Sequence, residues 1–350
     1  MELRTVDYHT AGEPFRIVVS DVGEIAGASV RERRETAAAT ERIDRVRRLL
    51  CHEPRGHADM YGCFVVPPDD EGGNFGALFW HKDGYSTACG HGTIALGAWA
   101  VESRRVAAPC DGQVDVVIDV PSGRVIARVR CASGAVEEVA FVNVPAWVIA
   151  RGVDAGEVRA DVAWGGAFYA FVPAAAFGLH VTPQDLPALI VAGRAVKAAL
   201  DGTPVSRHPH DERLSGIYGT VLTERIGPRH HRNVAIFADG EVDRSPTGSA
   251  TSARTRRTAA YRWRDRRRRR LAQRLDRRYE LHSPGNRRHR RGSAYRGLRN
   301  CIPDRRAPLR ARPSRPARDG VRPAVKDLAL PTPRGRAAAK RHGYGAAWAS

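Results

Sequence analysis

Two short stretches of the chain place a side chain with possible chemistry directly before a glycine. In "YSTACGHGTIALG" (residues 85–97) that residue is Cys89, and in "DRSPTGSA" (residues 243–250) it is Thr247. Glycine lets the backbone approach a ligand closely, and the free N–H groups of a helix start bind anions. Each stretch is therefore predicted to open a helix, and the two helix starts together would suit one small carboxylate.

Cys89 is the stronger candidate for chemistry. It precedes Gly90 and His91, and amides at a helix N-terminus favour the thiolate, which is the reactive form of cysteine. The thiolate can act as a base or a nucleophile, while the same amides hold a substrate carboxylate. The alternative is that Cys89 is a small core residue beside a tight turn.

The second stretch repeats this arrangement with a hydroxyl in place of the thiol. Thr247, Gly248 and Ser249 follow a proline and offer hydroxyls and free amides. Asp243, just upstream, has two possible roles: it could bind an ammonium group, or it could cap its own turn.

The sequence around these stretches predicts an α/β fold, because strand-like and helix-like patterns alternate along residues 1–254. Helices are predicted at 37–50, at 90–101 and at 183–200, the last with Thr182 as N-cap and Pro183 in its first turn. The predicted strands are 3–9, 15–20, 61–67, 75–81, a hairpin turning at 121–123, 137–145, 164–173, 216–223 and 233–239. A break near 145–160 predicts two domains, 1–150 with Cys89 and 151–254 with Thr247, of which the second would be truncated where the separate segment 255–350 begins.

The composition changes abruptly after residue 254. The whole chain of 350 residues carries a net charge of +19. Residues 255–350 hold 30 Arg and Lys against 6 Asp and Glu, so residues 1–254 alone have a balance of −5. The tail has few large aliphatic residues and includes "RWRDRRRRR" (262–270), so it is predicted to be disordered and unable to form a packed core.

Three accounts of residues 255–350 are open: a frameshift in GC-rich coding DNA, a basic arm that binds nucleic acid, and a tail without function. Lysine is scarce throughout the chain, which indicates GC-rich coding DNA. Such DNA read in a wrong frame yields arginine, proline and alanine, so the composition favours the frameshift.

The six cysteines show no paired spacing, and the N-terminus has no apolar targeting segment. These features predict a reduced, cytoplasmic protein that does not associate with a membrane.

Five segments together resemble the proline racemase family. They are "DYHTAGEP" (7–14), "EPRGHADMYG" (53–62), "CGHGT" (89–93), "WGGAFYAF" (164–171) and "DRSPTGSA" (243–250), and the resemblance covers residues 3–254. It implies two similar α/β domains, each a β-sheet wrapped around a central helix as in diaminopimelate epimerase. The active site would lie in the cleft between them.

The resemblance also implies roles for particular residues. Cys89 would be the proton acceptor, Asp243 would engage a ring nitrogen, and Thr247 would stand at the second catalytic position, where it could orient a leaving hydroxyl. The substrate carboxylate would be held by Gly90, His91, Gly248 and Ser249.

The racemases and epimerases of the family have cysteine at both catalytic positions, whereas this chain has Cys89 and Thr247. An alcohol is a poor base and a poor proton donor to a carbanion, so the pair resembles the dehydratase branch. That reaction converts trans-3-hydroxy-L-proline to Δ1-pyrroline-2-carboxylate without a cofactor or metal. The alternatives are a 4-hydroxyproline epimerase or proline racemase, an amino-acid-binding protein without turnover, and a nucleic-acid-binding protein that uses its tail. The expected partner is the small substrate, with a homodimer compatible with the family.

Overall fold

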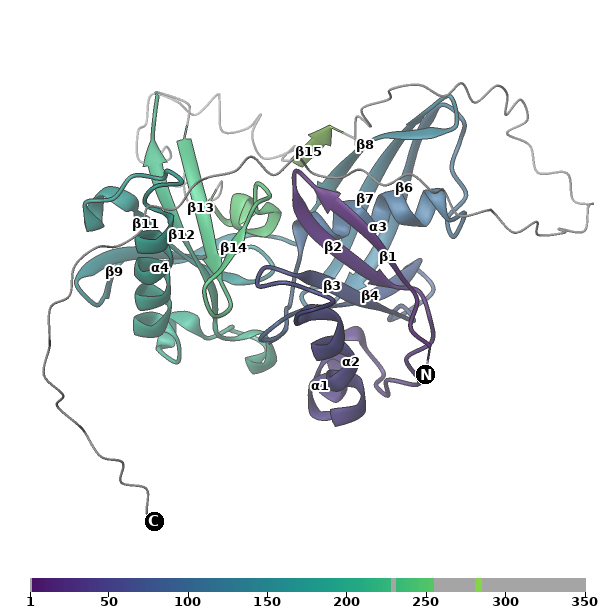
Figure 1. The fold of residues 1–350 in the computed structure, drawn as a ribbon, viewed down its shortest axis with the longest axis horizontal. Helices are drawn as coiled ribbons and strands as arrows, with labels where there is room; N and C mark the ends of the chain where they lie inside the picture. The colour runs from purple at the N-terminus through teal and green to yellow at the C-terminus, as the bar shows by residue number, and fades with distance from the viewer. Residues whose placement is uncertain (1, 228–230, 255–280, 285–350) are drawn as a thin grey trace, which may run out of the picture. The chain divides into compact units, whose positions relative to one another are not determined.

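A computed structural model describes residues 2–227, 231–254 and 281–284 of the chain (Figure 1). In these residues the strands form two sheets, one with the strand order β1-β2-β3-β4-β6-β7-β8-β15 and the other with the order β14-β13-β12-β11-β10-β9. A short strand, β5, pairs with β4 beside the first sheet. The mixed α/β architecture predicted from the sequence is therefore confirmed.

The first sheet is built from the N-terminal part of the chain. Its strands are β1 (Thr5–Thr10), β2 (Glu13–Val18), β3 (Tyr61–Val66), β4 (Phe75–His81), β5 (Gly84–Tyr85), β6 (Gly112–Val120), β7 (Gly123–Ala132) and β8 (Ala135–Val142). Its helices are α1 (Val30–Ala39), α2 (Glu41–Cys51) and α3 (Gly90–Glu102). Most neighbouring strands are antiparallel, but β2 and β3 run parallel, as do β4 and β6.

Helix α3 packs on one face of this sheet, and α1 and α2 pack on the other (Figure 1). The α3 side chains Ala95, Leu96 and Trp99 are buried against residues such as Phe15 of β2 and Phe141 of β8. A glycine in the middle of α3 lets the helix lie close to the sheet, because a Cβ on Gly97 would meet the side chain of Ala127 at 2.5 Å. The first sheet is thus wrapped around a buried central helix.

The second sheet is built from residues 147–243. Its strands are β9 (Trp147–Ala155), β10 (Val158–Trp164), β11 (Phe168–Pro173), β12 (Ile217–Arg225), β13 (His231–Phe237) and β14 (Glu241–Asp243). Helix α4 (Leu186–Leu200) covers one face (Figure 1), and short 3₁₀ turns lie at Ala174–Phe177, Pro204–Ser206 and Glu212–Leu214. The other face packs on Ala250 and Ala253, which belong to a helix that begins at Gly248 and is described as far as Arg254.

Several predicted elements differ from the observed ones. The single helix expected at 37–50 is two helices, because Thr40 takes an extended conformation between α1 and α2. The break expected near 145–160 contains β9 and the start of β10, and the sheets change between Val142 and Trp147. The strand expected at 164–173 turns at Gly165 and Gly166.

The helix expected to start at Thr182 begins instead at Leu186. Asp185 is its N-cap residue and Pro187 lies in its first turn. The Thr182 side chain accepts a hydrogen bond from the Asp185 amide at 3.4 Å, so it shapes the preceding turn and does not cap the helix.

Most of the basic tail lies outside the described residues. The prediction that the tail is disordered therefore concerns residues that the structure does not describe. One described segment of it, β15 (Leu281–Pro284), pairs antiparallel with β8 at the edge of the first sheet. In the described residues, no helix has the length and apolar character needed to cross a membrane.

Candidate active site

The two stretches singled out in the sequence meet at one small cavity. Helix α3 begins at Gly90, directly after Cys89, and the facing helix begins at Gly248, directly after Thr247. The helix starts are in backbone contact, since a Cβ added to Gly90 would lie 2.7 Å from the Gly248 Cα. The cavity is lined by all seven predicted site residues: Cys89, Gly90, His91, Asp243, Thr247, Gly248 and Ser249.

The cavity is nearly closed in this structure. Its volume is about 20 Å³, which is room for about one water molecule. Cys89 and Thr247 are 5% and 6% exposed. A ligand the size of proline can therefore bind only if the lining residues move apart.

Cys89 is the N-cap residue of α3, and its sulfur takes the place of a capping oxygen. The Gly92 amide donates a hydrogen bond to Sγ at 3.1 Å. That bond lowers the pKa of the thiol, but burial outweighs it and raises the pKa of Cys89 well above its ordinary value. The helix start was expected to favour the thiolate, and in the closed cavity this expectation is wrong because desolvation dominates.

His91 lies against the thiol and is held firmly. Its ring nitrogens Nδ1 and Nε2 are each 3.5 Å from the Cys89 sulfur. The Thr10 hydroxyl donates to the His91 carbonyl at 3.1 Å, and the Phe15 ring meets the imidazole edge-on. Burial lowers the pKa of His91, so its imidazole is neutral near pH 7.

Thr247 is held in an unusual backbone conformation. Its φ is +52°, in the left-handed region that β-branched residues rarely adopt. The Ser245 hydroxyl accepts a hydrogen bond from the Thr247 amide at 3.0 Å. The Thr247 hydroxyl is buried and has no hydrogen-bond partner among the described residues. An unpartnered buried hydroxyl on a strained residue points to a functional position.

Three tyrosines close the cavity on the other sides. The hydroxyls of Tyr61 and Tyr218 are 3.0 Å apart, and the Tyr169 hydroxyl is 2.6 Å from that of Ser249. Burial raises the pKa of all three phenols, so they stay protonated. The Ser249 hydroxyl can accept from Tyr169 and still donate its own proton, so both this hydroxyl and the Ser249 amide are available to a carboxylate.

Asp243 has the second of the two roles that the sequence left open, because it caps its own turn. Its Oδ1 accepts the Ser245 amide at 2.7 Å, so it caps the turn before Thr247, and its side chain also lines the cavity.

A second carboxyl, Glu13 of β2, lies beside Asp243, and sequence reasoning missed it. Single oxygens of Glu13 and Asp243 and a ring nitrogen of His91 all lie within 4.8 Å of one another. The signal was an acidic residue at the first position of the strand "EPFRIV", whose other charged residue is Arg16.

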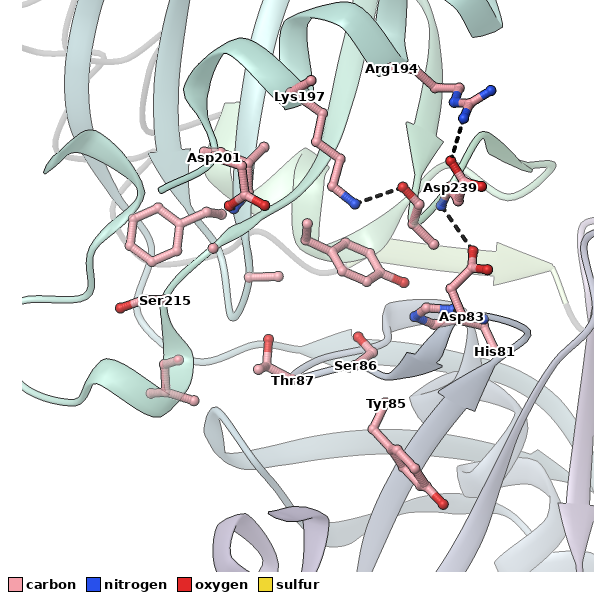
Figure 2. Close-up of a pocket in the computed structure, with 18 of the residues that line it drawn as sticks. His81, Asp83, Tyr85, Ser86, Thr87, Arg194, Lys197, Asp201, Ser215 and Asp239 are labelled. Atoms are coloured by element: carbon pink, nitrogen blue, oxygen red, sulfur yellow. Dashed lines mark hydrogen bonds and ion pairs between the residues drawn. The ribbon is translucent and has the colours of Figure 1, made fainter. Parts of the chain in front are cut away.

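A larger pocket borders the cavity through Tyr218, which lines both. Its volume is about 680 Å³, and it lies among side chains of β4, α4 and the segments after β4 and β13 (Figure 2). Arg194 pairs with Asp239 at 2.7 Å, and the Lys197 ammonium donates to the Ala238 carbonyl at 2.6 Å (Figure 2). The charged groups of Arg194 and Lys197 therefore already have partners within the protein.

One group of side chains beside this pocket has a spacing that could hold a metal ion. Ligand atoms of His81, Asp83 and Glu241 lie within 4.8 Å of one another. However, the His81 Nδ1 accepts the Asp83 amide at 3.2 Å, which leaves only Nε2 to bind a metal. Burial raises the pKa of Glu241 to about 9, so a metal ion would have to displace a proton from this carboxyl near pH 7. We assign no metal to this group.

Comparisons with known proteins agree with this geometry. The family model for proline racemase matches residues 5–261. A trans-3-hydroxy-L-proline dehydratase from Bacillus cereus is 43% identical over 256 residues, which is 71% of this chain and 76% of that protein. The protein of the same name from Homo sapiens is 41% identical over 263 residues, or 72% of this chain and 74% of that one.

Solved structures show the same fold at lower sequence identity. A hydroxyproline epimerase from Agrobacterium vitis aligns with a TM-score of 0.68 at 24% identity and covers 74% of this chain and 77% of its own. A probable proline racemase from Agrobacterium radiobacter aligns with a TM-score of 0.70, also at 24% identity, over 74% of this chain and 78% of its own.

Proposed function

The chain belongs to the proline racemase family, and we propose that it dehydrates trans-3-hydroxy-L-proline to Δ1-pyrroline-2-carboxylate. In this proposal it is a hydro-lyase whose protein groups perform the reaction without a cofactor. The observation that carries the proposal is the pair of residues at the two helix starts, Cys89 and Thr247, which line one buried cavity.

The two helix starts supply the binding site for the substrate carboxylate. Backbone amides at Gly90, His91, Gly248 and Ser249 surround the cavity, and a helix N-terminus stabilises a negative charge. The cyclic ammonium of the substrate is placed at Asp243, which keeps Oδ2 for it while Oδ1 caps the turn. The two ends of the amino acid are thus held by opposite charges, and Cα is held between the helices.

Cys89 removes the α-proton as its thiolate. The Gly92 amide favours the thiolate, and so does the ring ammonium of the substrate when it enters. Loss of the 3-hydroxyl then gives the enamine, which tautomerises to the imine.

Thr247 makes elimination the outcome. A racemase must return a proton to the opposite face of Cα, and a threonine hydroxyl is too weak an acid to do so near neutral pH. The carbanionic intermediate therefore decays by loss of the β-hydroxyl and is not inverted.

The test is to supply the full-length protein separately with trans-3-hydroxy-L-proline, L-proline and trans-4-hydroxy-L-proline. We expect the cyclic imine from the first and no D-configured product from the other two. Cys89→Ser is the control, with turnover reduced by about 10²–10⁴-fold because a hydroxyl replaces the general base. Inversion of L-proline or trans-4-hydroxy-L-proline as fast as dehydration would contradict the proposal and indicate a racemase or epimerase.

The same proposal includes the domains, the compartment and the partners of the enzyme. The two catalytic positions come from two domains, 1–150 and 151–254. The enzyme works in the cytoplasm on a small-molecule substrate, it needs no nucleic acid, and a homodimer is compatible with this function. The absence of paired cysteine spacing supports this compartment.

A further inference from the structure

The stereochemistry of the proposed substrate fixes the side from which its hydroxyl leaves. In trans-3-hydroxy-L-proline the hydroxyl at C3 and the carboxylate at C2 lie on opposite faces of the ring. The α-hydrogen at C2 is also opposite the carboxylate, so the α-hydrogen and the hydroxyl share one face. The base that removes this hydrogen is Cys89, so a proton donor for the leaving hydroxyl must lie on the Cys89 side of the cavity.

Thr247 cannot fill that role, because it comes from the facing helix. Around Cys89, the possible donors are His91, Tyr61 and Glu13. His91 is a neutral imidazole and would have to become an anion. The Tyr61 hydroxyl is engaged with Tyr218, and burial raises its pKa, which makes it a weak acid.

Glu13 has the geometry of a donor. It lies at the start of β2, in the sheet that carries α3 and Cys89, and it is 0% exposed. Its Oε2 accepts the Arg244 amide at 2.8 Å. Its Oε1 is buried and has no hydrogen-bond partner in the described part of the chain. One oxygen is thus fixed and the other has no partner. Glu13 does not line the cavity itself, but one of its oxygens lies within 4.8 Å of Asp243 and His91, which do.

The protonation state of Glu13 is consistent with this role. Burial, followed by the charge of Asp243, raises the pKa of Glu13 to about 8. The other groups that face it are Asp59, whose charge acts in the same direction, and Arg244, whose charge and amide act in the opposite one. Cys89 and His91 complete its titratable surroundings. Near pH 7 the Glu13 carboxyl therefore holds a proton that it can give away.

We propose that Glu13 is the general acid that protonates the departing 3-hydroxyl. The inference rests on the proposed dehydration. The Cys89 thiolate takes the α-proton, the C–H electron pair forms the C2–C3 double bond, and the C3–O bond breaks as the Glu13 proton moves to the oxygen. Water and the enamine leave. Cys89 then loses its proton to solvent and Glu13 regains one, which restores both groups, and the enamine tautomerises without a change in composition.

The experiment compares two leaving groups in the full-length protein. Hydroxide needs a proton to leave, whereas chloride does not, so trans-3-chloro-L-proline is the probe. Glu13→Gln keeps the shape of the side chain and an oxygen that accepts the Arg244 amide, but it has no acidic proton. We expect it to lower kcat for trans-3-hydroxy-L-proline by about 10²–10⁴-fold while chloride elimination and KM change little.

The pH profile is the second measurement. Hydroxyl elimination by the wild type should decline as Glu13 loses its proton at alkaline pH, and chloride elimination should lack that decline. Glu102→Gln, on the exposed end of α3, is the matched control and should leave both reactions unchanged. Because a carboxyl whose pKa is raised by folding lowers stability at pH values above its unfolded pKa, Glu13→Gln should melt no lower than the wild type at pH 8.

Three outcomes would overturn the inference or its basis. Equal losses for both leaving groups would make Glu13 a residue that only positions Asp243 and Arg244. Unchanged hydroxyl elimination in Glu13→Gln would assign the proton to another donor, such as the Cys89 thiol itself. A wild type that eliminates neither hydroxide nor chloride would instead refute the proposed dehydration.

Discussion

The contact between the two helix starts can be tested by adding one methyl group. In Gly90→Ala the new Cβ would lie 2.7 Å from the Cα, 3.1 Å from the amide nitrogen and 3.3 Å from the carbonyl carbon of Gly248. All three are backbone atoms of the facing helix, so no side chain can rotate away. Ordinary contact begins near 3.4 Å, and the helix starts must therefore separate by about 0.7 Å.

This separation would displace the backbone amides that hold the substrate carboxylate, and it would move the substrate Cα relative to the Cys89 sulfur. A misplacement of about 1 Å can cost about 10²-fold in rate, so we expect a loss of that order in kcat/KM. Overpacking commonly destabilises by about 1–3 kcal/mol, so the melting temperature should fall as well.

The assay is formation of the cyclic imine from trans-3-hydroxy-L-proline, together with thermal melting. Gly72→Ala is the matched control, because its Cβ would meet only the flexible ends of Arg124 and Asp70. Wild-type kcat/KM and stability in Gly90→Ala would refute the close approach of the helix starts. Equal losses in both variants would show that the effect is not specific to the cavity.

Three further predictions follow from other parts of the chain. Thr247→Cys should convert some L-proline to D-proline, as measured by chiral chromatography, because a thiol can protonate the far face of Cα; no D-proline above the wild-type level would contradict this. Burial raises the pKa of Glu241 to about 9, so the folded state binds a proton that the unfolded state releases, and stability should fall as pH rises from about 4.5 to 9. Glu241→Gln should flatten that slope and be more stable than the wild type at pH 8, and parallel slopes in melts of the two proteins at pH 5 and 8 would contradict it. Translation of the coding DNA after codon 254 in the other two frames should give a globular continuation in one of them; arginine-rich sequence or early stops in both would exclude the frameshift.

Local sequence was enough to predict the elements that carry the site. The run after Cys89 predicted a helix at 90–101, and α3 spans Gly90–Glu102. The proline and glycine around Thr247 predicted the second helix start, which lies at Gly248. These predictions succeed because a helix start depends on a few adjacent residues, whose capping groups and conformational limits can be read directly.

Contacts between distant segments could not be predicted in the same way. Glu13 meets the amide of Arg244 across 231 positions of sequence, and Tyr61 meets Tyr218 across 157. Each contact joins one sheet to the other, so it depends on how the two sheets pack. Nothing in the spacing of "EPFRIV" indicates that its first residue will face Asp243. The raised pKa of Cys89 was missed for the same reason, since burial is a property of the assembled cavity.

The residues that break local rules gather where the two sheets meet. Thr247 holds a positive φ, which costs about 1–3 kcal/mol, and it leaves a buried hydroxyl unpaired. Glu13 and Glu241 are carboxyls with almost no exposure, although an isolated buried charge is costly. Glu241 has a neighbour in His81, 3.4 Å away, outside the catalytic cavity. All three residues have buried oxygens without a hydrogen-bond partner among the described residues. Thr247 lines the catalytic cavity, and Glu13 lies beside His91 and Asp243, which line it. An unpartnered buried polar atom lowers stability, so the positions of Glu13 and Thr247 are best explained by a ligand that completes their hydrogen bonds during the reaction.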